Sequence, residues 1–93
     1  MNPYLSVVIP AYNEEKRIKK TLEAVDAYLK TQEFSWEVLI VIDGAKDKTA
    51  DVTNAFVAGK EGYRVIDRKE NRGKGYTVRE GMLAATGTVR LFT

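Results

Sequence analysis

The sequence contains neither cysteine nor histidine. Without cysteine the chain has no disulfide framework and no thiolate nucleophile. Without histidine it lacks the commonest general base and the commonest metal ligand, and the Ser-His and Cys-His nucleophile pairs are excluded. Any chemistry must therefore use carboxylates, lysine, tyrosine or a bound metal ion.

A strong charge of one sign and a long apolar run are also missing. The formal net charge is +2, which is too small to attract nucleic acid or an anionic membrane over a distance. No apolar stretch approaches the roughly 18 residues of a membrane-spanning helix, and no signal peptide is visible at the start of the sequence. We therefore expect no nucleic-acid partner and a cytoplasmic location.

The composition is that of a folded protein. The chain has 93 residues, of which 44% are hydrophobic and 30% charged, so we expect one small domain, or part of one, with a packed core. A chain of this size buries a smaller share of its surface than a larger domain does, so its stability margin should be thin.

Short apolar runs alternate with helical stripes along the chain. Strands are predicted at residues 5–9, 38–42, 63–66 and 89–92, and three helices between them. The helix residues expected to face the core are Ile18, Leu22, Val25, Leu29, Val52, Ala55, Phe56, Val78, Met82 and Ala85. Alternation of this kind predicts an α/β, Rossmann-like fold with about four parallel strands, three helices and right-handed crossovers.

Residues typical of turns and caps mark the ends of these elements. Pro10 is expected to stop the first strand. Asn13 is placed to cap the first helix, and Asp47 or Thr49 the second. The third helix is expected to run from about Lys74 to Ala85.

Three segments with candidate binding residues follow the first three strands, at residues 10–14, 43–47 and 71–75. Ligands of open parallel sheets bind at the carboxyl ends of the strands. Pro10 and Ala11 would let a flat ring approach the backbone, and Tyr12 offers an aromatic edge. Asp43 can accept a hydrogen bond from a base N–H group or a ribose hydroxyl.

The third segment suits an anion. Gly73 and Gly75 free the backbone at a helix N-terminus, and Lys74 adds a positive charge there, which together favour a phosphate. Two known phosphate motifs do not fit: Val78 occupies the third glycine position of G-x-G-x-x-G, and no G-x-x-x-x-G-K-[ST] loop occurs.

Each segment taken alone also has a purely structural interpretation. Pro10 and Asn13 can simply end a strand and start a helix, and Asp43 with Gly44 can form a turn. The glycines of residues 73–75 can serve a tight turn in the same way.

Read jointly, the segments are more specific. Residues 5–15 (LSVVIPAYNEE) resemble the opening of family 2 glycosyltransferases of the GT-A fold. That family continues with D-D-G-S-x-D-x-T, matched by residues 42–49 (IDGAKDKT), and with an N-x-G-K-G-like segment, matched by residues 71–75 (NRGKG). The resemblance covers nearly the whole chain, and the pattern looks closest to the branch that makes dolichyl- or polyprenyl-phosphate sugars.

The resemblance implies a set of nucleotide-sugar-binding residues. These are Pro10, Ala11, Tyr12 and Glu14 around the base, Asp43 on the base or ribose, and Gly73 and Lys74 near the base and diphosphate. Two positions depart from the family pattern, because Ile42 replaces the first aspartate and Ala45 replaces the serine. One polar contact with the nucleotide is therefore expected to be missing.

In this family the fourth strand leads into a D-x-D motif, whose carboxylates hold Mg²⁺ or Mn²⁺ against the sugar diphosphate. No D-x-D occurs in the sequence, and no acidic residue follows Glu80. We therefore expect residues 1–93 to be the N-terminal nucleotide-binding half of a glycosyltransferase domain. It would contain no catalytic or metal-binding residue, and the full-length parent would require the metal.

The parent is expected to move a sugar from a UDP- or GDP-sugar to an acceptor such as a polyprenyl phosphate, at the cytoplasmic face of a membrane. The chain alone should bind nucleotide weakly and should not turn over. The alternatives are a non-catalytic nucleotide-binding or regulatory module, and an assembly protein that has lost the pocket. The bare edge of the fourth strand predicts self-association.

Overall fold

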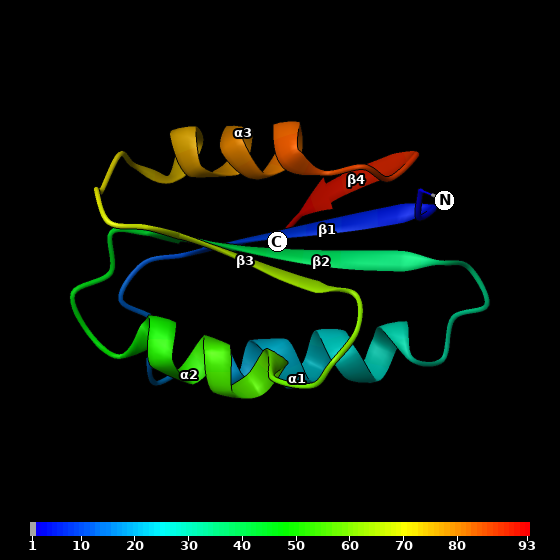
Figure 1. Cartoon of the computed structure of the whole chain (residues 1–93), viewed down its shortest axis with the longest axis horizontal. Coiled ribbons are helices and arrows are strands. Elements are labelled where there is room, and N and C mark those ends of the chain that lie inside the picture. Colours follow the sequence, from blue (N-terminus) through cyan, green and yellow to red (C-terminus); the bar gives the residue numbers. More distant parts are fainter. Residues whose placement is uncertain (1) are drawn as a thin grey trace.

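A computed structural model describes residues 2–93 and has the predicted α/β architecture (Figure 1). Its elements are β1 (Leu5–Ala11), α1 (Ile18–Leu29), β2 (Trp36–Asp43), α2 (Thr49–Val57), β3 (Tyr63–Arg68), α3 (Lys74–Ala84) and β4 (Val89–Phe92). The four strands are parallel and lie in the order β3-β2-β1-β4. Helices α1 and α2 cover one face of the sheet and α3 covers the other (Figure 1).

The core lies between β1, β2 and helix α1. Residues 38–42 of β2 are fully buried, as expected for a strand with neighbours on both edges and helices on both faces. Helix α1 packs the predicted stripe against the sheet, with Ile18, Leu22 and Leu29 buried and Val25 half-buried. Full burial of a leucine side chain contributes about 1.5–3 kcal/mol, so this stripe fixes α1 on the sheet.

Helix α3 lies closer to the sheet than expected for a helix that packs through Val78 and Met82. Val78 and Met82, which were expected in the core, are only half-buried, whereas Thr77 and Gly81 are buried. A Cβ atom at Gly81 would lie 3.0 Å from Val41 Cγ2 and closer still to Val8 Cγ1. The helix therefore rests on the sheet through a seam of small residues, and Ala85 is buried beyond its end as predicted.

The prediction that Pro10 stops the first strand is wrong, since β1 continues to Ala11. Tyr4 O accepts a hydrogen bond from Val89 N–H at 2.8 Å, and Val8 O accepts one from Thr93 N–H at 3.0 Å. Alternate residues of β1 thus face β4, and Pro10 is the next in this series. It lies beyond the last β1–β4 pair, Val8 with Phe92, so its missing N–H group removes no hydrogen bond from the ladder.

The predicted cap of the first helix is also wrong. Helix α1 starts at Ile18, and Asn13 lies upstream with a positive φ of 48°. Asparagine tolerates this left-handed conformation better than most residues, and its Oδ1 accepts a hydrogen bond from Lys46 N–H at 2.9 Å. At the second helix the N-cap residue is Lys48, not Asp47 or Thr49 as predicted, although Asp47 Oδ1 accepts the N–H of Thr49, the first residue of α2, at 2.9 Å.

Helix α2 faces the core with a stripe slightly rotated from the prediction. Val52 and Phe56 are half-buried as expected, but Ala55 is exposed and Thr53 is buried in its place. Thr49 and Thr53 are four residues apart and therefore share one side of the helix. Within residues 2–93, no helix combines the length and apolar character needed to cross a bilayer.

Candidate functional site

A cavity of about 620 Å³ lies at the carboxyl end of β1. From β1 the chain moves through β2 to β3 on one side, and α3 then returns it to β4 on the other side of β1. Open parallel sheets bind ligands where the strand order reverses in this way. The volume lies within the range of about 300–1,000 Å³ that is typical of small-molecule sites.

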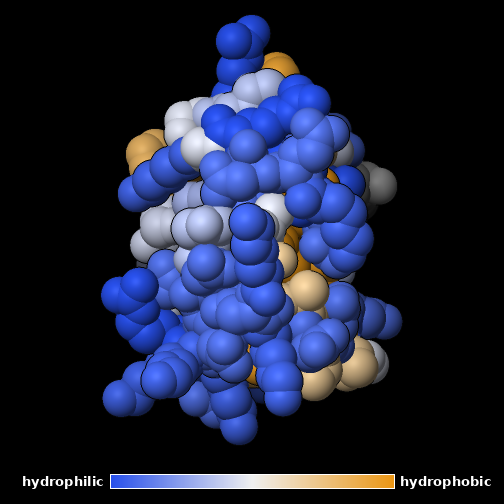
Figure 2. Space-filling view, turned by 90° about the vertical axis from the view of Figure 1, so that its left-hand side faces the viewer, coloured by the Kyte–Doolittle hydropathy of each residue, from blue (hydrophilic) through white to orange (hydrophobic). Residues whose placement is uncertain are grey.

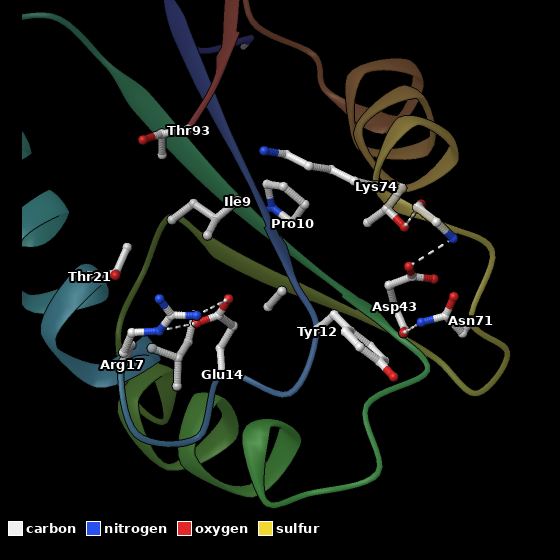
Figure 3. Close-up of a pocket in the computed structure, with 14 residues that line it drawn as sticks. Ile9, Pro10, Tyr12, Glu14, Arg17, Thr21, Asp43, Asn71, Lys74 and Thr93 are labelled. Carbon is white, nitrogen blue, oxygen red and sulfur yellow. Dashed lines mark hydrogen bonds and ion pairs between the residues drawn. The ribbon is translucent and has the colours of Figure 1, made fainter.

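The cavity brings together all seven residues that the sequence singled out (Figure 3). They are Pro10, Ala11, Tyr12, Glu14, Asp43, Gly73 and Lys74. It is also lined by residues that were not predicted, namely Ile9, Arg17, Ile18, Thr21, Asn71, Thr77 and Thr93. Figure 2 looks onto this end of the molecule, where hydrophilic residues cover most of the surface and a narrow hydrophobic strip shows between them.

The end of β1 and the residues that follow it form a largely apolar wall with an exposed aromatic ring. Ala11 is buried, Pro10 is half-buried and Tyr12 is 46% exposed. The N–H group of Glu14 donates to Thr49 Oγ1 at 2.8 Å, which ties this segment to the start of α2. The hydrogen bond from Lys46 N–H to Asn13 gives a second tie. Both ties lie at residues 13 and 14, so the wall is held at this end without involving the Tyr12 ring.

Asp43 lies deeper, with its carboxylate almost fully engaged. Oδ1 accepts the N–H of Arg72 at 2.7 Å and a hydrogen bond from the Arg68 guanidinium, and Oδ2 accepts the N–H of Gly73 at 3.0 Å. A carboxylate offers about four acceptor positions, so one remains for a ligand. Burial acts to raise the pKa of Asp43, but the hydrogen bonds from Arg72, Arg68 and Gly73 outweigh it and the pKa lies below its ordinary value.

Arg68 lies behind the cavity and is a further residue of this region that was not predicted from the sequence. It pairs directly with Asp43 across β2 and β3, and its side chain is only 12% exposed. The sequence prediction ended the third strand at Ile66, two residues too early, and so left Arg68 outside the sheet. Extending β3 by the register of Val38 with Tyr63 would have brought the two charges together.

Lys74 supplies a positive charge at the start of α3. Its side chain points from the helix into the cavity (Figure 3), and within residues 2–93 no carboxylate lies within ion-pair distance of its ammonium group. The first N–H groups of any helix lack intrahelical partners and carry a partial positive charge. Gly73, with a φ of 93°, gives the sharp turn into the helix. This corner of the cavity is thus suited to an anion.

The opposite rim carries an ion pair. Arg17 Nε lies 2.9 Å from Glu14 Oε2, and both residues line the cavity. The Arg17 side chain is well exposed, so the pair contributes little to stability. It leaves Glu14 partly neutralised beside the wall formed by β1.

The described residues do not form a divalent metal site. No cluster of three or more acidic or other ligating side chains occurs in this part of the chain. Of the two carboxylates that line the cavity, Asp43 is bound by Arg68 and two N–H groups, and Glu14 is paired with Arg17. The two carboxylates together therefore do not supply the several free oxygen ligands that Mg²⁺ or Mn²⁺ requires.

Comparison with known proteins shows the family of the chain. Residues 6–93 match the family described as Glycosyl transferase family 2. The chain belongs to this family. Dolichyl-phosphate beta-glucosyltransferase of Drosophila melanogaster is 44% identical over 95 residues, which covers 95% of this chain and 29% of that protein. The human protein of the same name is 39% identical over 90 residues, covering 89% of this chain and 28% of that protein.

The chain thus spans less than a third of the length of these curated relatives. Among solved structures, S. aureus TarS 1-349 in complex with UDP-GlcNAc is 29% identical with a TM-score of 0.81, covering 97% of this chain and 26% of that one. The mannosyltransferase PcManGT of Pyrobaculum calidifontis, in complex with GDP-Man and Mn²⁺, has a TM-score of 0.77 at 22% identity, covering 92% and 25%. The latter likeness concerns the fold alone, and both confirm the predicted GT-A architecture.

The two departures from the family pattern have clear places in this fold. Ile42 is fully buried in the core at the end of β2, where an aspartate would be strongly disfavoured without a partner. Ala45 packs, half-buried, against the same core cluster. Neither position contributes a polar group to the cavity.

Proposed function

We propose that the cavity at the end of β1 binds the nucleoside diphosphate part of a nucleotide sugar. The observation that carries the proposal is the meeting of an aromatic and apolar wall with a free lysine at a helix N-terminus in one cavity. Residues 10–12 would take the flat base, and the start of α3 with Lys74 would take the diphosphate. Backbone N–H groups and a lysine together favour bound phosphate.

The parent enzyme, in this proposal, transfers a sugar from a UDP- or GDP-sugar to a lipid phosphate at a membrane. The names of the relatives support a dolichyl-phosphate acceptor and a glucosyl donor. TarS in complex with UDP-GlcNAc supports a uridine nucleotide. The Mg²⁺ or Mn²⁺ of the parent would be held by carboxylates other than Asp43 and Glu14, since both are already engaged.

We further propose that residues 1–93 bind nucleotide but do not transfer sugar by themselves. The chain covers only 28–29% of the dolichyl-phosphate glucosyltransferases that it resembles, so the acceptor and the metal would be bound by other parts of the parent. The check is release of nucleoside diphosphate from UDP-glucose or GDP-mannose in the presence of Mn²⁺. Robust release by this chain would refute the proposal.

Calorimetric titration of the chain with UDP and GDP tests the binding proposal. Lys74→Met should weaken binding about 10- to 100-fold, because a hydrogen bond to a charged group is worth about 1.5–3 kcal/mol. Lys60→Met is the matched control: it removes the same charge from the segment after α2, at the end of the molecule away from the cavity. Equal affinities for the two variants would contradict the assignment of Lys74.

A second proposal concerns self-association through β4. Val89, Leu91 and Phe92 are 39%, 42% and 53% exposed on this edge strand, and unpaired strand edges with apolar side chains favour pairing with another chain. Light scattering over a concentration series should show dimers or larger species, and Leu91→Lys should reduce them. A monomer at every concentration would contradict this proposal and would leave the nucleotide site unaffected.

A further inference from the structure

The side chain of Arg68 is the centre of a polar network behind the cavity. Its Nε donates to Glu70 O at 2.9 Å, and one terminal nitrogen donates to Glu80. The other terminal nitrogen donates to Asp43 and, at 2.6 Å, to Thr77 Oγ1. All three guanidinium nitrogens are therefore used, and they join β2, β3, α3 and the loop between β3 and α3.

Two partners of Arg68 hold Gly73 from opposite sides. Asp43 accepts the Gly73 N–H at 3.0 Å. Thr77 bonds the Gly73 carbonyl twice, through its backbone N–H at 3.0 Å and its hydroxyl at 2.8 Å. Because Arg68 contacts both Asp43 and Thr77, one buried side chain fixes the turn from which Lys74 enters the cavity.

The charge of Arg68 matters as much as its geometry. Asp43 lies at the end of the cavity where the diphosphate is proposed to bind, and a buried carboxylate there would repel an anion. The Arg68 guanidinium, whose single positive charge is shared between Asp43 and Glu80, offsets part of this charge without reaching the cavity itself: Asp43 lines the cavity and Arg68 does not. Interactions of this kind are strong because both side chains are shielded from water.

We propose that Arg68 is a positioning residue for nucleotide binding: it orients Asp43 and Thr77 so that Gly73 and Lys74 face the diphosphate, and it offsets part of the negative charge of Asp43 beside that anion. The proposal rests on the nucleotide-binding function proposed above. Arg68 itself does not contact the ligand in this proposal. Asp43 holds the loop through its hydrogen bonds, and this role is independent of any contact that Asp43 makes with the nucleotide.

The test compares Arg68→Met with Arg64→Met on the same strand. Arg64 also bonds a carboxylate, Glu37, and a backbone carbonyl, Ala84 O, but it lies four residues earlier, toward the opposite end of β3. Affinity for UDP should fall about tenfold or more in Arg68→Met and stay within about twofold in Arg64→Met. Without ligand, the amide resonances of Gly73 and Lys74 should move only in Arg68→Met.

A double variant distinguishes positioning from a merely structural effect. In Arg68→Met the unpaired Asp43 charge repels the diphosphate, so adding Asp43→Asn should restore part of the lost affinity. A purely structural network would instead lose further affinity with the second change. Arg68→Lys keeps the positive charge but loses the planar guanidinium with its several N–H donors, so its affinity for UDP should lie between those of the unmodified chain and Arg68→Met. If Arg68→Met does not fold, Arg68→Lys replaces it in the test.

The outcomes separate the two proposals. If the unmodified chain binds no UDP, the proposed function fails. If it binds UDP and Arg68→Met, or Arg68→Lys in its place, binds equally well, only the role of Arg68 fails. An Asp43→Asn/Arg68→Met variant that binds more weakly than Arg68→Met would also overturn the neutralisation argument.

Discussion

Replacing Gly81 by alanine should destabilise the protein, although alanine is the better helix former. Gly81 lies on the buried side of α3, where an added Cβ would come within 3.0 Å of Val41 Cγ2 and closer to Val8 Cγ1. Favourable carbon contacts need about 3.5–4.0 Å. Both valines are branched at Cβ and stiff, so the helix must move away from the sheet.

The magnitude follows from two opposing terms. Overpacking a core lowers the free energy of unfolding by about 1–3 kcal/mol, whereas replacing glycine by alanine within a helix raises it by about 1 kcal/mol. With a contact this short we expect a net loss of about 1–2 kcal/mol in the free energy of unfolding. For a domain of this size each kcal/mol shifts the Tm by about 4–8 °C.

Gly75→Ala is the matched control in the same helix. A Cβ at Gly75 meets no atom within 4 Å, so this variant should gain about 0.4–1 kcal/mol through the lower entropy of its unfolded chain. Urea unfolding followed by circular dichroism measures both. A Gly81→Ala variant that is as stable as Gly75→Ala would refute the close seating of α3 on β1 and β2.

Further predictions concern the loops around the cavity. The pKa of Asp43 is lowered in the folded state, so its contribution to stability is full above the unfolded value of about 3.9 and is lost as the pH falls through the lower folded value. The stability difference between the unmodified chain and Asp43→Asn should therefore be large at pH 7 and should shrink as the pH falls below the unfolded value; a difference in urea midpoints that stays constant with pH would contradict this. Asn13→Ala should cost about 1 kcal/mol, because it loses the bond to Lys46 N–H and places a Cβ-bearing residue without a polar side chain at positive φ. Asn13→Gly should cost less than Asn13→Ala in the same assay, because glycine adopts this φ freely, and the reverse order would contradict the left-handed conformation.

Much of the fold follows from local patterns in the sequence. The apolar run of residues 38–42 predicts the central strand because only a strand covered on both faces tolerates five successive apolar side chains. The spacing of Ile18, Leu22 and Leu29 predicts the buried side of α1 for a similarly local reason. The segments that line the cavity could be grouped in advance, since the carboxyl ends of parallel strands share one edge.

Contacts between residues that are far apart in the sequence could not be predicted from local patterns. Arg68 gains its role from the pairing of β3 with β2, which places it opposite Asp43. Asn13 looks like a helix cap by its type and position, but its partner is Lys46, a residue 33 positions away. Val78 and Met82 fit a buried stripe, yet the small residues Thr77 and Gly81 allow the helix to approach the sheet on another side.

We propose that a nucleoside diphosphate binds in the cavity at the end of β1. Titrating UDP into isotope-labelled protein, while recording backbone amide resonances, tests it most directly. We expect shifts that saturate and that centre on Ala11, Tyr12, Gly73 and Lys74, with little change around Glu37 at the opposite end of the sheet. Resonances that stay unmoved up to millimolar UDP, or shifts centred on the far end of the sheet, would contradict it.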